Sequence, residues 1–501
     1  MAVNVQETEI KYDAPPGAGL PGLDRLPGVA AISGPEEQRL EAEYYDTGDL
    51  RLLRAGITLR HRSGGDDDGW HLKLPTGDST RREIRRPLGG TGRQVPGELA
   101  GLVRVHTRGA PVKPVARMTT TRRRLVLLDK AGESLAEVAA DDVAAQALGP
   151  TAAVSRWQEV EVELTGGDRR LLKAAGDLLR HDGLRPAGRA AKLERALAGR
   201  LPGPGQPAAS PSAGQVVLAY LRAHADRLKA LDPLVRLDEP DAVHQMRVAS
   251  RRLRGTLRSF GRILPRDATA GLGADLKWLG GVLGVARDGE VLAAHLRAGL
   301  REAPVELRLG PVDARIQGHF ASIRAAARTE LLAVLDSERY FSLLDDLDRL
   351  LARPPLTPEA ARPPAEVLPA AARRARRQAS RRMRRAWHAA PGQARNEALH
   401  RARKSARRAR YAAEAMAPAI GTKAARFARR MKRVQSVLGE HQDSVIARAV
   451  ARDLGVSAHL AGENAFSYGL LYERGVCAGE RLQAQARRIW KKASRPSRWP
   501  R

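Results

Sequence analysis

Glu7, Glu9 and Lys11 are the first residues of the chain whose types and spacing suggest chemistry. In a β-strand, side chains two positions apart point to the same face. A strand at this point would carry two carboxylates and one amine on one face, with Ile10 and Tyr12 on the other. Carboxylate oxygens are ligands for Mg²⁺, and basic side chains bind phosphate oxygens. Such a strand could bind a divalent metal beside a phosphate-bearing substrate, but any exposed strand could carry this pattern, so the interpretation depends on the other charged strands.

Short segments that alternate between charged and apolar residues continue up to residue 200, as is typical of antiparallel β-structure. They supply Arg60 and Arg62 in "TLRHR", Lys73 in "HLKLP", a basic cluster around Arg123 in "TTRRRLVL", and Glu159, Glu161 and Glu163 in "WQEVEVEL". Many strands with one charged and one apolar face favour a closed sheet whose charged faces point inward. The outer apolar faces would pack against helices or another domain, and one helical stretch is expected near 168–183.

The balance of charge divides the chain into two parts. The whole chain has 86 Lys and Arg against 56 Asp and Glu, a net charge of +30. Residues 1–210 contain 31 basic and 28 acidic side chains, whereas 211–501 contain 55 and 28. A segment rich in Pro, Gly and Ser separates them, so we expect a β domain at 1–200, a linker at 201–214 and a helical domain at 215–501. The basic excess of the second domain favours a polyanionic partner.

Other features of the composition narrow the classes of function. An aromatic content of 4% disfavours binding of single-stranded nucleic acid through base stacking. The single cysteine, Cys477, excludes an internal disulfide framework. No secretory signal and no membrane-spanning apolar run are visible. We therefore expect a cytoplasmic protein without a membrane segment, with association to polyphosphate granules as a further expectation.

The basic domain contains an internal repeat. "VHQMRVASRRLRG" at 243–255 aligns with "LHRARKSARRARY" at 399–411, and "LGVARD" at 283–288 aligns with "LGEHQD" at 438–443. We interpret this as two helical repeats, at about 215–352 and 370–501. On a helix, His244, Arg247, Arg251 and Arg254 would form a stripe ~15 Å long. Like charges at these spacings repel one another, so the stripe costs stability unless an anion neutralises it.

Residues 215–501 resemble the CHAD family, whose members consist of two four-helix repeats. The resemblance rests on the H-x-x-R helix with its following arginines and on the L-G-x-x-x-D segment. It implies binding of inorganic polyphosphate in a basic groove between the repeats. Val248 and Gln442 depart from the repeat, because the other copy has Lys404 and Arg287 there. The candidate polyphosphate-binding residues are His244, Arg247, Arg251, Arg252, Arg254, Lys277, His400, Arg403, Lys404, Arg407, Arg408, Arg410, Lys432 and His441.

Residues 1–200 resemble the CYTH, or triphosphate tunnel metalloenzyme, family in length and strand order. The resemblance implies a metal-dependent site that uses Mg²⁺ or Mn²⁺. The matching metal-binding acids are Glu7, Glu9, Glu159 and Glu161, with Asp141 or Asp142 as a further acid. The matching triphosphate-binding bases are Lys11, Arg60, Arg62, Lys73, Arg123 and Lys192. The segment "RREIRRP" departs from the family, because Arg85 stands where many relatives have an acid.

The resulting expectation is an α+β multidomain protein, with an antiparallel β tunnel followed by an all-α bundle of two four-helix repeats. Four functions remain open. The first is hydrolysis of inorganic triphosphate or a related triphosphate, with polyphosphate bound by the helical domain. The second is polyphosphate binding without catalysis. Adenylate cyclase activity and nucleic-acid binding are less favoured, because no adenine-recognising or base-reading element is visible.

Overall fold

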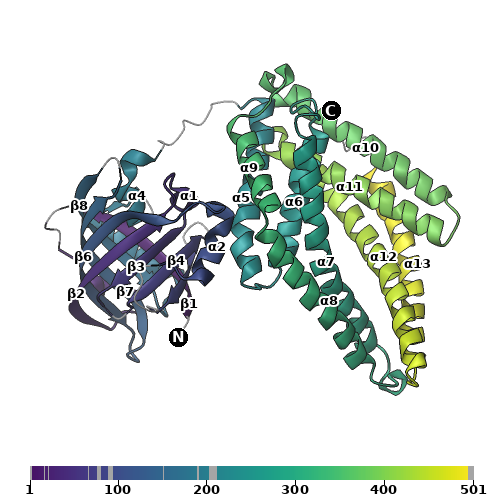
Figure 1. Cartoon of the computed structure of the whole chain (residues 1–501), viewed down its shortest axis with the longest axis horizontal. Helices are drawn as coiled ribbons and strands as arrows, with labels where there is room; N and C mark the ends of the chain where they lie inside the picture. The colour runs from purple at the N-terminus through teal and green to yellow at the C-terminus, as the bar shows by residue number, and fades with distance from the viewer. Residues whose placement is uncertain are drawn as a thin grey trace. The chain divides into compact units, whose positions relative to one another are not determined.

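The computed structural model describes residues 3–15, 17, 19–20, 22–65, 67–75, 80–87, 94–149, 152–188, 191–201 and 211–494. The chain forms two compact units, residues 1–206 and 207–501, which are described separately below (Figure 1). The predicted linker at 201–214 lies largely outside the described residues. The first helix after it begins at Ala213, where the Ser212 side chain accepts a hydrogen bond from the N–H of Gln215.

The first unit is a closed antiparallel β-barrel. Its strands are β1 (Val3–Ala14), β2 (Ala31–Asp46), β3 (Thr58–Ser63), β4 (Gly69–Pro75), β5 (Thr80–Arg86), β6 (Lys113–Leu128), β7 (Ser134–Ala147), β8 (Ala153–Leu164) and the two-residue β9 (Arg185–Pro186). The order in the sheet is β5-β4-β3-β2-β6-β7-β8-β1-β9, and pairing of β1 with β5 closes a barrel of eight strands. The predicted antiparallel tunnel fold is confirmed.

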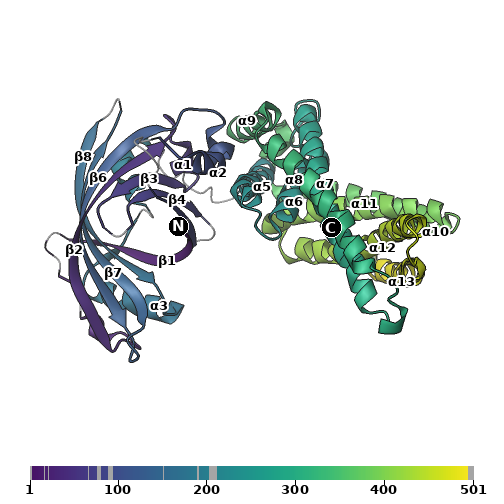
Figure 2. The same cartoon turned by 60° about the horizontal axis from the view of Figure 1, so that its bottom comes forward.

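Four helices accompany the barrel: α1 (Arg51–Arg54), α2 (Gly97–Thr107), α3 (Arg169–His181) and α4 (Lys192–Ala196). The sequence predicted α3 but not α2 or the single-turn α1 and α4. Helix α3 begins after Asp168, whose side chain accepts hydrogen bonds from the N–H groups of Arg170 and Leu171. It packs against the apolar outer face of the barrel (Figure 2). Its Leu171, Leu172 and Leu179 belong to one buried core with Val160 and Val162 of β8. Charged side chains of the strands line the inner face of the barrel.

The second unit is entirely helical in the part of the chain that is described. Its helices are α5 (Ala213–Arg236), α6 (Ala242–Ser259), α7 (Ala270–Arg301), α8 (Val312–Leu335), α9 (Glu338–Ala352), α10 (Pro364–His388), α11 (Gln393–Ile420), α12 (Thr422–Leu460) and α13 (Phe466–Ala493). The sequence repeat pairs α6 with α11 and α7 with α12. Helices α5–α8 therefore correspond to α10–α13, and α9 is an addition between the two halves.

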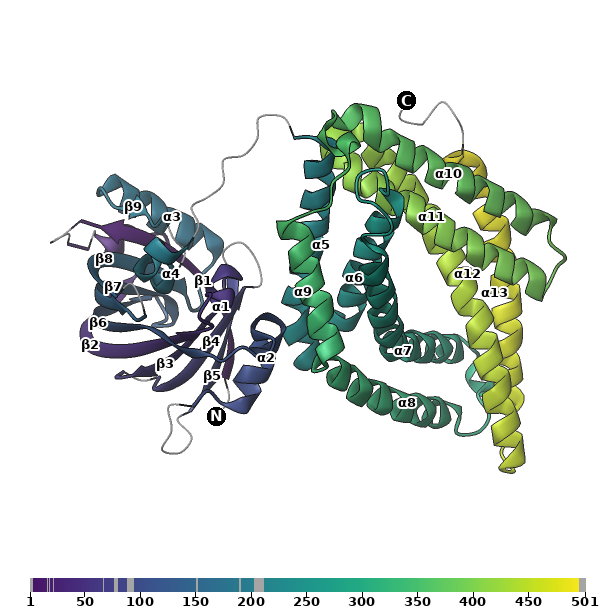
Figure 3. The same ribbon diagram turned by 45° about the horizontal axis from the view of Figure 1, so that its top comes forward.

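Packing within the helical unit joins the two repeats at two places. Helices α6 and α11, which carry the repeated histidine and arginines, contact each other directly. At the far ends of α7, α8, α12 and α13, a shared core forms around Leu296, Phe320, Ala451 and Tyr468. Figure 3 shows the long helices α10–α13 of the second repeat in succession. The two basic helices therefore lie against each other, and the repeats share a second contact at the far ends of their long helices.

Candidate functional site

The interior of the barrel is a charged cavity of about 290 Å³. Among the described residues that line it, nine are basic and seven are acidic. Strand register explains this mixture, because inward-facing residues of neighbouring strands lie opposite one another. Lys11 of β1 is paired with Glu161 of β8, and Arg122 of β6 with Asp141 of β7. Charges of both signs therefore meet across the strands.

Three carboxylates in the barrel form a group that could hold a metal ion. Asp141, Glu159 and Glu161 each offer one oxygen, and these oxygens lie within 4.8 Å of one another. The Nζ atom of Lys192, at the start of α4, lies 2.9 Å from Asp141, 2.6 Å from Glu159 and 2.6 Å from Glu161. An ammonium group therefore sits among these oxygens. The hard oxygen donors and their attraction for a cation fit Mg²⁺ or Mn²⁺.

The protonation of this group follows from burial and from its basic neighbours. Burial alone would raise the pKa of Glu161, but Lys11, Lys192 and Arg122 bring it well below its usual range. Burial raises the pKa of Glu159 in spite of Lys192. The pKa of Lys192 is well above its usual value, because three carboxylates outweigh its burial. Lys192 is therefore fully charged at neutral pH, and Glu161 is an anion.

A second ionic group lies where β1, β4 and β5 meet. Lys73 Nζ is 2.6 Å from Glu7 and 3.7 Å from Glu83, and Nδ1 of His71 is 2.9 Å from Glu83. Burial raises the pKa of Glu7 and lowers that of His71 to about 4. His71 is therefore neutral at pH 7 and supports Glu83 by a hydrogen bond. Arg85 also pairs with Glu83, so the basic departure seen in the sequence faces an acid in the structure.

The structure brings most of the predicted barrel residues into this one cavity. Those that line it are Glu7, Glu9, Lys11, Arg60, Arg62, Lys73, Glu161 and Lys192. Glu9 lies 3.3 Å from Lys11, and the structure does not gather Glu7 and Glu9 into the three-carboxylate group. Burial and the neighbouring Arg60 and Arg122 lower the pKa of Arg62 to about 9.

Four predicted barrel residues do not line the cavity. Asp141 and Glu159 are buried in the three-carboxylate group, beside Lys192 of the lining, and the other two are exposed. Arg123 is exposed, and its neighbours Arg122 and Arg124 line the cavity in its place. Asp142 is exposed and hydrogen-bonded to Gln158, whereas Asp141 belongs to the three-carboxylate group. The reason in both cases is the alternation of side chains along a strand. Arg122, not Arg123, is therefore the arginine of this pair that faces the cavity. Of the two candidate metal-binding aspartates, only Asp141 belongs to the three-carboxylate group.

Sequence reasoning did not assign eight further charged residues that line the cavity: Asp67, Arg81, Glu83, Arg85, Arg122, Arg124, Glu137 and Glu163. Burial, followed by Glu7, raises the pKa of Glu163 to about 7. A signal for Glu163 was present, because it continues the alternation of Glu159 and Glu161. For Glu83 the only signal was its place in a short alternating segment.

In the helical unit, four arginines from α6 and α11 form a central cluster: Arg247, Arg251, Arg403 and Arg407. Burial, followed by repulsion from Arg251, lowers the pKa of Arg407 to about 10, and burial also lowers that of Arg251. The Nε atoms of Arg247, Arg251 and Arg403 are buried without a hydrogen-bond partner. Repelling cations with unused donors are arranged to receive an anion.

The two glycines of the repeated L-G-x-x-x-D segment position this cluster. A Cβ atom at Gly284 of α7 would lie 3.2 Å from Nη2 of Arg247, and one at Gly439 of α12 would lie 3.2 Å from Nη2 of Arg403. Each guanidinium therefore lies close against a glycine of the next helix. The aspartate of the segment completes the arrangement in the first repeat, where Arg247 Nη1 donates to Asp288 at 2.6 Å.

The three predicted histidines differ in their surroundings. His244 and His400 are half-buried beside the central cluster, and burial lowers the pKa of both. His441 is only 1% exposed, and its Nε2 lies 3.1 Å from the Gln483 side chain on α13. The prediction that His441 contacts phosphate is therefore not supported. Its position in α12 faces the core, and burial lowers its pKa to about 4.

The remaining predicted residues are distributed unevenly. Lys404 and Lys432 are exposed. Arg254, Lys277 and Arg408 line a second cavity of about 340 Å³. Arg252 and Arg410 both hydrogen-bond to Glu414, at 3.2 and 2.6 Å. These two arginines are already neutralised by an internal acid.

Comparison with known proteins identifies both units. The model of the CYTH domain matches residues 6–190, and that of the CHAD domain matches residues 219–452. Two uncharacterized proteins from strains of Mycobacterium tuberculosis are each 36% identical to this chain over 497 residues, covering 96% of it and 94% of their own length. The chain belongs to the family of proteins that join a CYTH domain to a CHAD domain. CYTH enzymes have the triphosphate tunnel fold and depend on a metal.

Two solved structures are each similar to somewhat more than half of this CYTH–CHAD protein. PptA from Streptomyces chartreusis is 23% identical, covers 56% of this chain and all of its own, and has a TM-score of 0.47. The CHAD domain from the plant Ricinus communis is 25% identical, covers 58% of this chain and 94% of its own, and has a TM-score of 0.42. Among the described residues, no helix is both long and apolar enough to cross a membrane.

Proposed function

We propose that the CYTH barrel hydrolyses inorganic triphosphate with the help of a divalent metal, and that the CHAD unit binds inorganic polyphosphate. One observation carries the proposal: a single closed barrel contains both the three-carboxylate group and a set of basic side chains. Metal ligands and phosphate-binding donors are both needed to cleave a phosphoanhydride bond.

The basic side chains would hold the substrate. Lys11, Arg122 and Lys192 now pair with Glu161 and its neighbours, and a triphosphate offers oxygens that can replace these partners. Arg60, Arg62 and Lys73 contribute donors from β3 and β4. Arg62 remains charged at pH 7, because its lowered pKa of about 9 is still above that value. These bases orient the phosphates and offset their negative charge.

Asp141, Glu159 and Glu161 would hold the metal, with Mg²⁺ or Mn²⁺ as the expected ion. When bound, the ion offsets charge that develops on the transferred phosphoryl group. The protein's own contribution is to hold these carboxylates close together and, by lowering the pKa of Asp141 and Glu161, to keep those two ionised. Lys192 does this at present, because its ammonium group contacts all three.

An inorganic substrate is favoured over a nucleotide by the lining of the cavity. Tyr44 is the only aromatic residue among the described residues that line it, and its hydroxyl accepts a hydrogen bond from Arg60. A nucleobase would find little surface on which to stack. This lining supports triphosphatase activity over adenylate cyclase activity.

The test is phosphate release from tripolyphosphate by the full chain, with Mg²⁺ or Mn²⁺ and with ATP as the comparison substrate. Asp141→Asn is expected to lower the rate about 100-fold or more, because it removes one charge from the metal group. Asp142→Asn is the matched control and should retain the rate. Equal rates for wild type and Asp141→Asn would contradict the proposal. Absence of metal-dependent release from wild type would leave polyphosphate binding without catalysis as the function.

Binding by the CHAD unit is tested separately with long-chain polyphosphate. The central cluster of four arginines supports binding of a flexible phosphate chain that can pass over both repeats. We expect polyphosphate to bind in a salt-dependent manner and to resist displacement by duplex DNA at equal phosphate concentration. Displacement by DNA would favour nucleic acid as the partner instead.

A further inference from the structure

The two repeats of the CHAD unit differ in charge at one pair of corresponding positions. In the alignment of α6 with α11, Arg258 corresponds to Glu414. The same alignment pairs Arg252 with Arg408 and Arg254 with Arg410. Each end of the contact between α6 and α11 is therefore built from corresponding residues, except that one end has an arginine where the other has a glutamate.

Glu414 neutralises its own end of this helix pair. It accepts hydrogen bonds from Arg252 Nε at 3.2 Å and from Arg410 Nε at 2.6 Å. The hydroxyl of Tyr220 donates to it as well, at 3.3 Å. Arg252 and Arg410 each direct one donor to this carboxylate, which would repel an approaching phosphate.

The opposite end is a cationic pocket of about 340 Å³. Its basic lining consists of Arg254, Arg258, Arg266, Lys277 and Arg408, and the described part of the chain gives none of these five an acidic partner. Burial, followed by Arg258 and Arg254, lowers the pKa of Arg408, so the cations lie close enough to repel one another. The first turn of α7 lines the same pocket through Thr269, Ala270 and Gly273. The positive end of that helix dipole adds to the attraction for an anion.

A lysine, Lys404, lies near both the pocket and the central arginine cluster, and the Glu414 end has no corresponding charge. Lys404 on α11 lies within electrostatic range of Arg403 and Arg407 of the cluster and of Arg254 in the pocket. The residue that corresponds to Lys404 in the first repeat is Val248. One positive charge therefore lies near both the cluster and the pocket, and its counterpart in the first repeat is uncharged.

We propose that this pocket is an end site, which binds the terminal phosphate of a polyphosphate chain whose inner phosphates lie over the central cluster. The inference rests on the proposed polyphosphate binding and adds a direction to it. A terminal phosphate has a second ionisable oxygen with a pKa near 6, so it carries more charge and more free oxygens than an inner phosphate. Five cationic side chains in one pocket match that extra charge. The Glu414 end, by contrast, accepts no phosphate.

The experiment compares two polyphosphate preparations of the same length by calorimetric titration of the full chain. One has free ends, and the other has both terminal phosphates blocked as alkyl esters. Wild type is expected to bind the free-ended chain about tenfold more tightly, which corresponds to one or two charge-assisted hydrogen bonds. Arg258→Glu, which places the acid of the second repeat in the first, should remove this preference. Arg258→Ala should reduce it.

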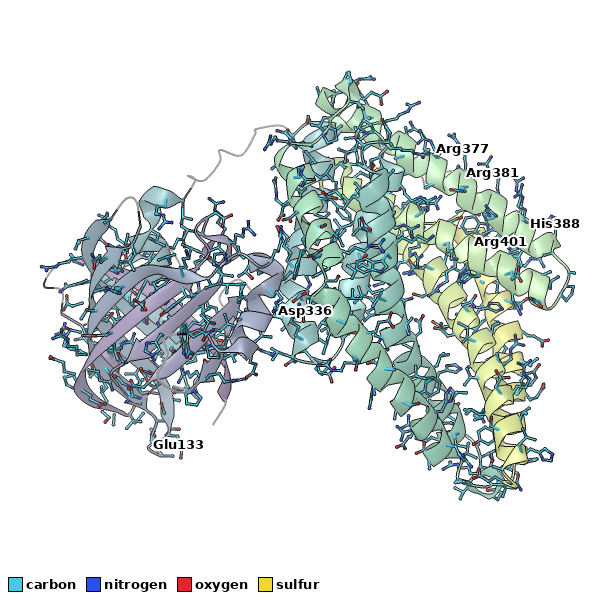
Figure 4. All side chains as sticks on the ribbon, viewed as in Figure 1. Glu133, Asp336, Arg377, Arg381, His388 and Arg401 are labelled. Atoms are coloured by element: carbon cyan, nitrogen blue, oxygen red, sulfur yellow. The ribbon has the colours of Figure 1, made fainter. Side chains whose placement is uncertain are left out.

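Arg381→Glu is the control for net charge, because Arg381 is exposed and projects from α10 (Figure 4). Arg381→Glu should lower the affinity for both polyphosphate preparations by the same factor. The barrel is untouched by Arg258→Glu, so the difference between the variants reports the pocket alone. An unchanged preference for free ends in Arg258→Glu, or an equal loss for both preparations, overturns the end site. Failure of wild type to bind either preparation removes the proposed polyphosphate function together with it.

Discussion

The Nζ atom of Lys192 lies 2.6 Å from Oε1 of Glu159, so an ammonium group occupies the region where the three carboxylates could hold a metal ion. The two residues come from α4 and β8, and the leucine that follows Lys192 is buried with Trp157 of β8. Packing of Leu193 therefore holds the lysine in place. A divalent ion bound to the same oxygens would be repelled by this ammonium.

Competition between Lys192 and the metal can be measured directly. Lys192→Met is expected to raise the affinity for Mn²⁺ without substrate about tenfold, because it removes a positive charge a few Å from the ion. The same variant should raise KM for tripolyphosphate, since one phosphate-binding donor is lost. Electron paramagnetic resonance of free Mn²⁺ gives the affinity. Lys173→Met, an exposed position on α3, is the control, and an unchanged Mn²⁺ affinity in Lys192→Met would argue against the assigned site.

Arg122 and Arg123 are neighbours in sequence whose side chains lie on opposite sides of the barrel wall. Arg122 donates to Asp141 at 2.7 Å and to Glu161 at 3.0 Å within the barrel, whereas Arg123 is exposed. Arg122→Ala is expected to raise KM for tripolyphosphate about tenfold or more, as one charge-assisted contact is lost. Arg123→Ala should leave KM within about twofold. Steady-state kinetics decide, and the reverse ranking of the two variants would refute the cavity assignment.

Gly284 tests how closely the central cluster depends on the glycines. A methyl group there would lie 3.2 Å from Arg247 Nη2, so the guanidinium must move by a few tenths of an ångström. We expect Gly284→Ala to weaken polyphosphate binding about threefold, while alanine stabilises the helix by up to about 1 kcal/mol. Gly281 lies in the same helix, and nothing lies within 4 Å of a carbon added there. Gly281→Ala should therefore stabilise the helix to a similar extent without weakening polyphosphate binding. Calorimetry measures the polyphosphate affinity, and denaturant unfolding measures the stability. Equal affinities in the two variants would show that the cluster does not depend on Gly284.

His441 should make the stability of the CHAD unit depend on pH. Burial lowers its pKa to about 4, below the value of 6.5 expected in the unfolded chain. Between these values the unfolded chain binds more protons, so stability is complete above pH 6.5 and is lost as the pH falls toward 4. Between pH 7 and pH 5 the loss from this residue is about 2 kcal/mol.

The measurement for His441 is urea unfolding of the full chain at several pH values, followed by the circular dichroism of the helices. His441→Gln should show a shallower loss of stability in acid than wild type. The comparison isolates His441 from His224, whose pKa burial also lowers to about 4. Parallel pH profiles for wild type and variant would show that His441 does not contribute.

The linear pattern of residues was sufficient for much of the fold. Alternation of charged and apolar residues predicted a closed sheet with a charged interior, and the repeat of the histidine–arginine helix predicted two related helical halves. These properties are local, because the face on which a side chain lies follows from the period of its strand or helix. The acids Glu159 and Glu161 and the bases Lys11 and Lys73 could be assigned on that basis alone.

Tertiary structure decided the rest. In the run Arg122–Arg124, every position is basic, so only the register of β6 against β2 and β7 shows that Arg123 points outward. The same holds for Asp141 and Asp142. His441 faces a core that is completed by α13, and Glu414 neutralises Arg252 across the two repeats. Such contacts join residues distant in sequence, and their energies depend on burial and on neighbouring charges that no local pattern contains.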